Sequence, residues 1–259
     1  MREAWAVEVR KARRSRLPAV TAAAFAVTTA VAGMFMFILK DPQRARDLGL
    51  LGTKAELSGA VADWPGYLAL LAQTTAVGGV MIFGVTVIWI FGREFSDHTA
   101  KDLLALPTAR TTIVAAKFAV TAVWCLLLAL ETFLLGLGVG AALSLPDWSA
   151  TTAAEGLGRI LLTALMTWLL VSVLAWAASA GRGYLAAVGV MFVIVFLAQI
   201  VAALGYGHVF PWSVPGIYSG IAGDGKPAVG PVGFALVGVV GIAGVAATVW
   251  WWRDADQAR

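Results

Sequence analysis

Six long apolar runs restrict the fold of this chain more than any other feature of its sequence. Each run is close to the roughly 20 residues that an α-helix needs to cross the hydrocarbon core of a bilayer. The sequence therefore predicts an all-α integral membrane protein. Its six expected spans lie at about 17–39, 67–91, 112–145, 157–180, 184–204 and 231–252.

The composition supports the same class. Charged residues make up 13% of the chain and the mean hydropathy is +0.83, whereas a soluble domain is about 25% charged. The net charge of +4 does not indicate a nucleic-acid protein, because the bases flank the apolar runs instead of forming a patch. The first run has 23 residues, too long for the apolar part of a signal peptide, which has about 7–15. We therefore expect an uncleaved span.

The distribution of bases predicts the topology. An even number of spans places both termini on one side, together with the segments 92–111 and 181–183. That side carries 13 of the 19 Lys and Arg residues. Because cytoplasmic segments are enriched in Lys and Arg, we expect both termini in the cytoplasm. Residues 1–16 are predicted to form a basic helix lying on the inner leaflet, or a solvated basic tail, and residues 253–259 a cytoplasmic tail.

The segment 93–110 is a charged interval between the second and third spans. Its apolar positions, Phe95, Thr99, Leu103 and Leu106, recur at helical spacing, so we expect a short amphipathic helix there. Asp97 and Lys101 are four residues apart in the favourable order for an ion pair. Pro107 should end the helix at Leu106. Such a helix has one face with which to dock on a soluble partner.

Two connecting segments are left open by the sequence. Residues 40–66 are expected to be a loop or a short surface helix. Residues 205–230 contain Pro211, Trp212 and Pro215, which fit either a partly re-entrant element or a plain surface loop. Within the third span, Gly136 and Gly140 are spaced to allow close helix approach, and Lys117 is expected at the inner interface. The single cysteine, Cys125, excludes an intrachain disulfide.

Few residues carry chemistry of their own. Gly220 to Lys226 match the pattern of a phosphate-binding loop, but Pro227 follows where a Mg²⁺-binding hydroxyl is needed, so no nucleotide site is expected in this chain. Glu131 is the only acid deep in a span, where it could line a pathway, carry a proton or bond another helix, with Gln199 and Trp124 as possible partners. His98 and His208 fall on opposite sides, so no shared metal site is expected.

The chain resembles the permease subunits of type-2 ATP-binding-cassette (ABC) exporters. It is most similar to the bacterial group that includes bacitracin and lantibiotic self-protection permeases and sodium-export permeases. The resemblance covers the layout of the whole chain. It rests most on residues 91–96, on the segment 103–110 with its two leucines, proline and base, and on Ala116-Lys117. Thr99 stands at the family's threonine, whereas His98 stands where glycine is common.

This resemblance implies an exporter subunit driven by a partner. The helix after the second span would be a coupling helix that fits a groove on a separate ATP-binding subunit, which would hold ATP and Mg²⁺, so this chain needs no cofactor. The implied contact residues are Glu94, Phe95, Asp97, Lys101, Leu103 and Leu104, with Pro107 and Arg110 transmitting motion into the third span. Two ATP-binding subunits and a second permease, identical or related, would complete the complex in a bacterial plasma membrane. The expected substrate is amphiphilic: an antibiotic peptide, a drug or a lipid-like molecule.

Two other classes remain open from the residues. A membrane-embedded enzyme would use Glu131 and His208, although the spans show no paired catalytic groups. An ATP-independent, ion-coupled transporter would need an inverted repeat, and residues 17–110 show no similarity to residues 118–252.

Overall fold

The structure, a computed structural model, describes residues 2–49, 61–99, 103, 108–220 and 229–254. Within these ranges the chain is helical, with no strand. The long helices are α2 (Leu17–Lys40), α4 (Trp64–Ser96), α6 (Arg110–Ala142), α7 (Ala150–Val171), α8 (Val173–Ala180), α9 (Tyr184–Ala203) and α11 (Pro231–Asp254). The helices α7 and α8 continue each other across Ser172, so six helical units are long and apolar enough to span a membrane, as predicted.

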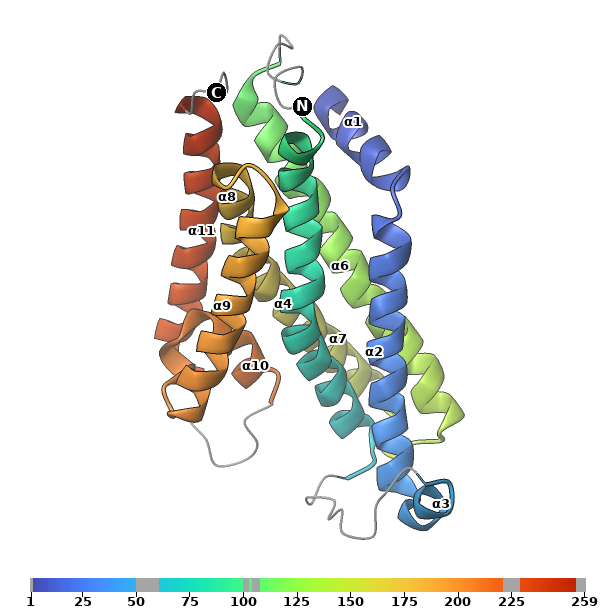
Figure 1. Cartoon of the computed structure of the whole chain (residues 1–259). Coiled ribbons are helices and arrows are strands. Elements are labelled where there is room, and N and C mark those ends of the chain that lie inside the picture. Colours follow the sequence, from blue (N-terminus) through green and yellow to red (C-terminus); the bar gives the residue numbers. More distant parts are fainter. Residues whose placement is uncertain (1, 50–60, 100–102, 104–107, 221–228, 255–259) are drawn as a thin grey trace.

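The short helices occupy the two ends of this bundle. The first, α1 (Arg2–Arg13), precedes α2 and is tilted away from its axis (Figure 1). The others are α3 (Pro42–Asp47), which follows α2, and η1 (Gly207–Val209), η2 (Pro211–Ser213) and α10 (Val214–Tyr218), which follow α9. The segment 40–66, expected to be a loop or a short surface helix, therefore contains a short helix, and the described part of 205–230 contains three short helices.

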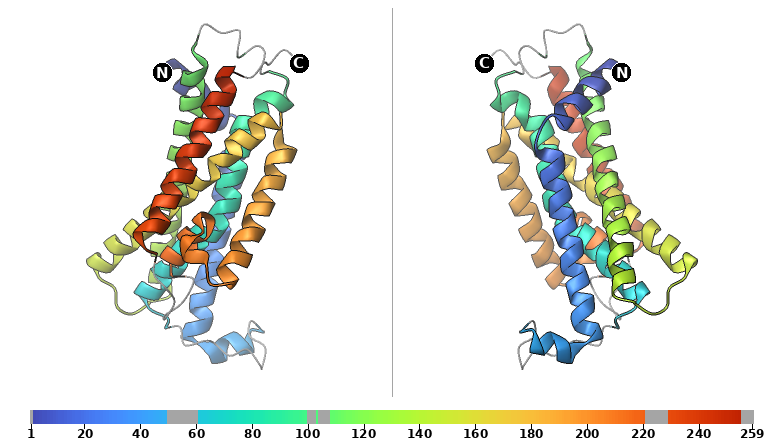
Figure 2. Two further views of the ribbon diagram at one scale, coloured as in Figure 1. Left: turned by 90° about the vertical axis from the view of Figure 1, so that its left-hand side faces the viewer. Right: turned by 90° about the vertical axis from the view of Figure 1, so that its right-hand side faces the viewer.

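Helix α4 lies at the centre of the bundle, and its neighbours α2, α6, α7, α8 and α9 surround it (Figures 1 and 2). Most of its length is buried, whereas α9 exposes most of its apolar surface, which suits a helix that faces lipid. α1 and the last turns of α11 lie at one end of the bundle, and α3 and α10 lie at the other (Figure 1). Which end faces the cytoplasm rests on the distribution of bases.

Both ends of α4 differ from the expected span 67–91. The helix starts at Trp64, where the side chain of Asp63 caps it by accepting a hydrogen bond from the Gly66 amide at 2.7 Å. At its end, α4 continues to Ser96 instead of stopping near residue 91. The first residues of the charged segment are therefore the last turn of a span and do not begin a separate helix. The helix stops before His98, which adopts a left-handed conformation with φ of 57°.

Glycines allow α6 to approach α4 closely, as the spacing of Gly136 and Gly140 predicted. A Cβ atom added at Gly136 would lie 2.3 Å from Leu71, and one at Gly140 would lie 2.5 Å from the Trp64 ring. Both helices gain packing contacts that a larger residue would prevent. By contrast, an added Cβ at Gly138 would meet no atom within 4 Å.

Three tryptophans link neighbouring helices through their indole N–H groups. Each donates to a hydroxyl oxygen on another helix: Trp124 to Thr21 at 3.0 Å, Trp168 to Thr121 at 3.0 Å, and Trp252 to Ser179 at 2.9 Å. These bonds satisfy donors that would otherwise be buried in an apolar bundle. Trp124 is thus occupied by Thr21 and is not a partner of Glu131, contrary to one of the possibilities that the sequence suggested.

Candidate functional site

A buried cluster of charged side chains lies at the end of the bundle that carries α1. Its centre is Lys117 of α6, whose side chain is 1% exposed. The Lys117 ammonium donates to Glu8 Oε2 at 3.1 Å, to Glu94 Oε1 at 3.0 Å and to the carbonyl oxygen of Ile90 at 3.1 Å. An ammonium has three donors, so each has an acceptor. Lys117 is therefore a buried anchor between α1, α4 and α6 at this end of the bundle.

Glu94 in the last turn of α4 is the second centre of the cluster. One carboxylate oxygen accepts from Lys117 and also from Lys11 at 2.8 Å. The other accepts from the hydroxyl of Thr99 at 2.7 Å, just beyond the turn that ends α4. Glu94 is only 3% exposed. The carboxylate is thus fully engaged within the chain and joins three segments: α1, α6 and the start of the charged loop.

Helix α1 supplies the remaining members of the cluster. Glu8 and Lys11 lie three residues apart on one face of this helix, 3.5 Å from each other, and both face α4 and α6. The cluster contains two acids and two bases, so its formal charges cancel. A buried pair is stabilising only when its members remain paired, and removal of one partner typically costs about 3–5 kcal/mol. The cluster therefore fixes the position of α1 against the two spans.

An aromatic contact joins the end of α4 to the end of α11. The ring of Phe95 packs edge-on against Trp251 and Trp252, with centroids 5.5 Å and 5.7 Å away. Arg110, the first residue of α6, donates to the backbone carbonyls of Trp252 and Arg253 at 3.3 Å and 3.1 Å. A cation at these carbonyls satisfies acceptors that the end of a helix leaves free. Phe95 and Arg110 thus tie both borders of the charged segment to α11.

The expected ion pair of Asp97 with Lys101 involves a residue outside the described part of the chain. Asp97 accepts a hydrogen bond from Nε of Arg93 at 3.1 Å, one turn earlier on α4. The amide of Leu103 donates to the Thr99 carbonyl at 3.1 Å, and its side chain packs on the apolar core.

The structure places the predicted coupling residues in two groups. Phe95, Asp97, Leu103 and Arg110 are described and lie at the same end of the bundle, whereas Lys101, Leu104 and Pro107 fall outside the described residues. The expectation that Glu94 presents its side chain to a partner needs correction, because Glu94 is buried beneath α1 and fully paired. Glu94 and its neighbours can instead position the segment that follows.

Glu131 lies in α6, away from this cluster. It is partly buried, and among the described residues it makes no hydrogen bond or ion pair. Gln199 lines a separate cavity beside Trp212 and Ser213. His208 lies in η1 at the opposite end from the ion cluster. Within the described residues, no hydrogen bond or ion pair joins Glu131 to Gln199 or to His208, the residue that the enzyme hypothesis pairs with it.

Sequence reasoning missed the contribution of α1 to the site. Glu8 and Lys11 were assigned to a membrane-facing basic helix, but their spacing of three residues places them on one face. A further signal was available in Lys117, a lone base within an apolar run. A charge in such a run needs a buried partner. Glu94, the first acid after the second span, is this partner.

Six helical units of spanning length, with α4 buried among the others, make this chain a multi-pass integral membrane protein. Comparison with known proteins identifies its family: the chain belongs to the ABC-2 family of transporter proteins, whose sequence model matches residues 5–198. The chain is also 25% identical, over 179 residues, to the bacitracin transport permease protein BCRB of Bacillus licheniformis. That match covers 69% of this chain and 85% of the relative. The family indicates a transporter permease and not an enzyme, and implies an ABC ATP-binding partner in general.

Proposed function

We propose that this chain is the membrane subunit of an ATP-driven exporter in a bacterial plasma membrane. It moves an amphiphilic substrate, such as an antibiotic peptide, a drug or a lipid-like molecule, out of the cell by alternating access. A separate ATP-binding subunit supplies the energy. The observation that carries this proposal is the family match over residues 5–198, which spans α1 through most of α9.

The substrate class draws support from the relative. The protein that aligns with 69% of this chain is a bacitracin transport permease, and bacitracin is a peptide antibiotic. The bundle itself is lined by few intramembrane charges, with Glu131 the only acid deep in a predicted span. An amphiphilic molecule is a better match to such a bundle than a polyanion.

The proposed coupling surface lies at the end of the bundle that carries the ion cluster. Phe95, Asp97, Lys101, Leu103 and Leu104 form the surface for the ATP-binding subunit. Pro107 and Arg110 carry displacement of this surface into α6, because Arg110 is the first residue of that helix. Glu94 acts indirectly, since its bonds to Lys117 and Thr99 hold the end of α4 in place.

The proposed assembly contains two ATP-binding subunits and two permeases, the second being identical or related to this chain. Both termini and the coupling surface face the cytoplasm, where ATP is available. This orientation agrees with 13 of 19 bases falling on that side. An ATP-independent transporter that uses Glu131 remains the second candidate, because Glu131 lacks a partner within the described residues.

The test is growth in the presence of bacitracin. Cells that express the chain with an ATP-binding subunit should tolerate more bacitracin than cells with either protein alone. A matched strain should carry the same permease with an ATP-binding subunit that cannot hydrolyse ATP. If this strain tolerates no more bacitracin than cells with the permease alone, ATP-driven export is supported. Protection by the permease alone would favour the ATP-independent candidate. Unchanged tolerance in every strain would exclude bacitracin as a substrate.

A further inference from the structure

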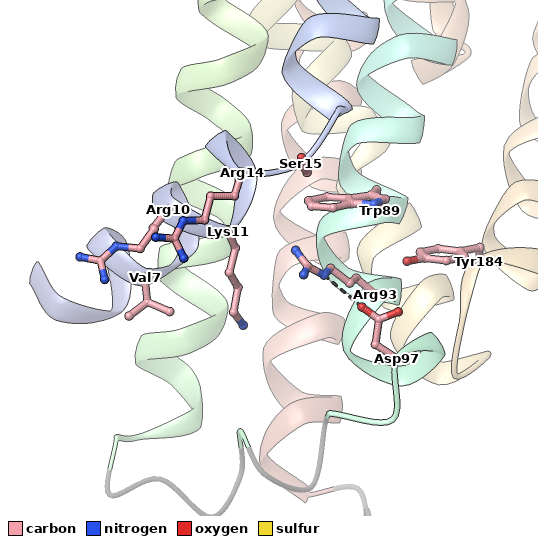
Figure 3. Close-up of a pocket in the computed structure, with 9 residues that line it drawn as sticks. All are labelled: Val7, Arg10, Lys11, Arg14, Ser15, Trp89, Arg93, Asp97 and Tyr184. Carbon is pink, nitrogen blue, oxygen red and sulfur yellow. Dashed lines mark hydrogen bonds and ion pairs between the residues drawn. The ribbon is translucent and has the colours of Figure 1, made fainter.

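A cationic cavity lies next to the ion cluster and shares Lys11 with it. Helices α1, α4 and the start of α9 border an open cavity of about 510 Å³ (Figure 3). Its lining contains four bases and one acid. The lining residues are Val7, Arg10 and Lys11 of α1, Arg14 and Ser15 of the turn that follows it, Trp89 and Arg93 of α4, Asp97 at the end of that helix, and Tyr184 of α9.

The charges of this cavity do not cancel. Lys11 is paired with Glu94 in the ion cluster, and Arg93 is paired with Asp97. Arg10 and Arg14 remain, and within the described part of the chain neither guanidinium makes a hydrogen bond or ion pair. Arg14 follows directly after α1, its amide donates to the Arg10 carbonyl at 3.1 Å, and both side chains are exposed. Two positive charges are thus held beside a cavity without an internal counter-ion.

Arg93, on the wall of the cavity that faces α1, is oriented to bind a ligand. Its guanidinium lies 4.9 Å from the centre of the Trp89 ring and uses Nε for Asp97. No hydrogen bond joins its two terminal nitrogens to another described residue. In Figure 3 this side chain extends from α4 toward Lys11 of α1. A planar guanidinium fixed by an aromatic ring is well suited to bind a phosphate oxygen.

We propose that this cavity is a binding site for an anionic, phosphate-bearing ligand, and that a phospholipid headgroup occupies it. Arg10 and Arg14 provide the charge and Arg93 provides directed hydrogen bonds. Basic pockets between spans are a known mode of headgroup recognition. This inference does not depend on the proposed function.

The surroundings favour a lipid over free phosphate. Trp89 and Tyr184 line the cavity, and such residues concentrate at headgroup depth. Directly after Tyr184, α9 presents an exposed apolar face on which Leu185 is 88% exposed, Phe192 57% and Phe196 66%. The spacing of seven and four residues places these side chains along one face of the helix. A headgroup in the cavity would leave its acyl chains beside this face.

The test is ligand-induced stabilisation of the purified full-length chain in neutral detergent at constant ionic strength. Unfolding is followed with a thiol-reactive dye, because the single cysteine, Cys125, is buried. The probes are dihexanoyl phosphatidylglycerol, dihexanoyl phosphatidylcholine and inorganic phosphate. We expect phosphatidylglycerol to raise the unfolding midpoint at lower concentrations than phosphatidylcholine. A response to inorganic phosphate at equal concentration would assign the same site to a free anion.

Paired variants separate this site from general attraction to a basic helix. Arg10→Gln/Arg14→Gln should weaken phosphatidylglycerol binding about 30-fold, since each base near an anionic headgroup contributes a roughly fivefold gain. Arg2→Gln/Arg16→Gln removes the same charge from exposed positions outside the cavity lining, and should weaken binding less than Arg10→Gln/Arg14→Gln does, because screening by salt reduces the effect of charges that do not contact the ligand. All four arginines are exposed, so both variants should unfold at the wild-type midpoint without ligand. Equal weakening in the two variants, or stabilisation by no probe, would overturn the proposal.

Discussion

The buried ion cluster makes a quantitative prediction for Lys117→Met. Methionine keeps the length of the side chain but removes the ammonium, so Glu8 Oε2 and the Ile90 carbonyl lose their donor and Glu94 keeps only Lys11 and Thr99. Two carboxylates then share one ammonium in a site where Glu8 is 6% exposed and Glu94 is 3% exposed. Removing one partner of such a group typically costs about 3–5 kcal/mol.

Thermal unfolding of the detergent-solubilised protein measures this loss. At about 2–4 °C per kcal/mol for a chain of similar size, Lys117→Met should lower the midpoint by roughly 6–20 °C. The buried thiol of Cys125 again provides the signal. The matched control is Arg159→Met on α7, where the side chain is exposed, and the midpoint should change by no more than about 2 °C.

A double variant tests whether charge pairing is the cause. Lys117→Met/Glu8→Gln removes one base and one acid, which leaves Lys11 opposite Glu94. Its loss of stability should be smaller than the sum of the two single losses by at least about 1 kcal/mol. Additive losses, or a Lys117→Met midpoint equal to that of Arg159→Met, would refute the reasoning.

Two further predictions concern α6. Gly140→Ala should destabilise the protein by about 1–3 kcal/mol because its Cβ would overlap the rigid Trp64 ring. Gly138→Ala, with open space at its Cβ, should be neutral or stabilise the protein by up to about 1 kcal/mol. A lower thermal midpoint for Gly138→Ala than for Gly140→Ala would contradict the α4–α6 packing. Glu131→Leu should increase the free energy of unfolding by up to about 2.5 kcal/mol, and so raise the midpoint, because it removes an unpaired carboxyl from a span. A lower midpoint would show that Glu131 has a stabilising partner.

The spans could be predicted from the sequence because span length is a local property. An apolar run such as 17–39 must be long enough to cross a bilayer, whatever it packs against. The close approach at Gly136 and Gly140 was predictable for the same reason, since four-residue spacing places both glycines on one face. The helix ends were harder to predict. Helix α4 continues to Ser96 because Glu94 has buried partners that an isolated charged turn would lack.

The ion cluster could not be predicted in full, because its members meet only through packing. Glu8 and Lys117 are separated by 109 positions, and Lys117 and Glu94 by 23. The sequence indicated Glu94 as a functional residue but placed it on an outer surface. Its burial follows from the position of α1, which a pattern of bases near a terminus does not determine.

The same distinction applies to the borders of the charged segment. The periodicity of Phe95, Thr99 and Leu103 predicts an apolar face but not what covers it. In the structure Phe95 contacts Trp251 and Trp252, and Thr99 bonds Glu94. Part of the face that was expected to meet another subunit is therefore used within the chain, and the proposed coupling surface depends more strongly on Asp97, Lys101, Leu103 and Leu104.

Co-purification with an ATP-binding subunit tests the central claim most directly. The affinity-tagged chain, co-expressed with that subunit, should retain it and its ATP hydrolysis through detergent purification. The Leu103→Asp variant should lose the ATP-binding subunit. The Leu48→Asp variant, altered at an exposed position beside α3 at the other end of the bundle, should retain the subunit. The thiol assay must find both variants folded, since Leu103 also packs on the core. A wild-type chain that binds no ATP-binding subunit, or a folded Leu103→Asp variant that binds it as well as wild type, would contradict the proposed coupling surface.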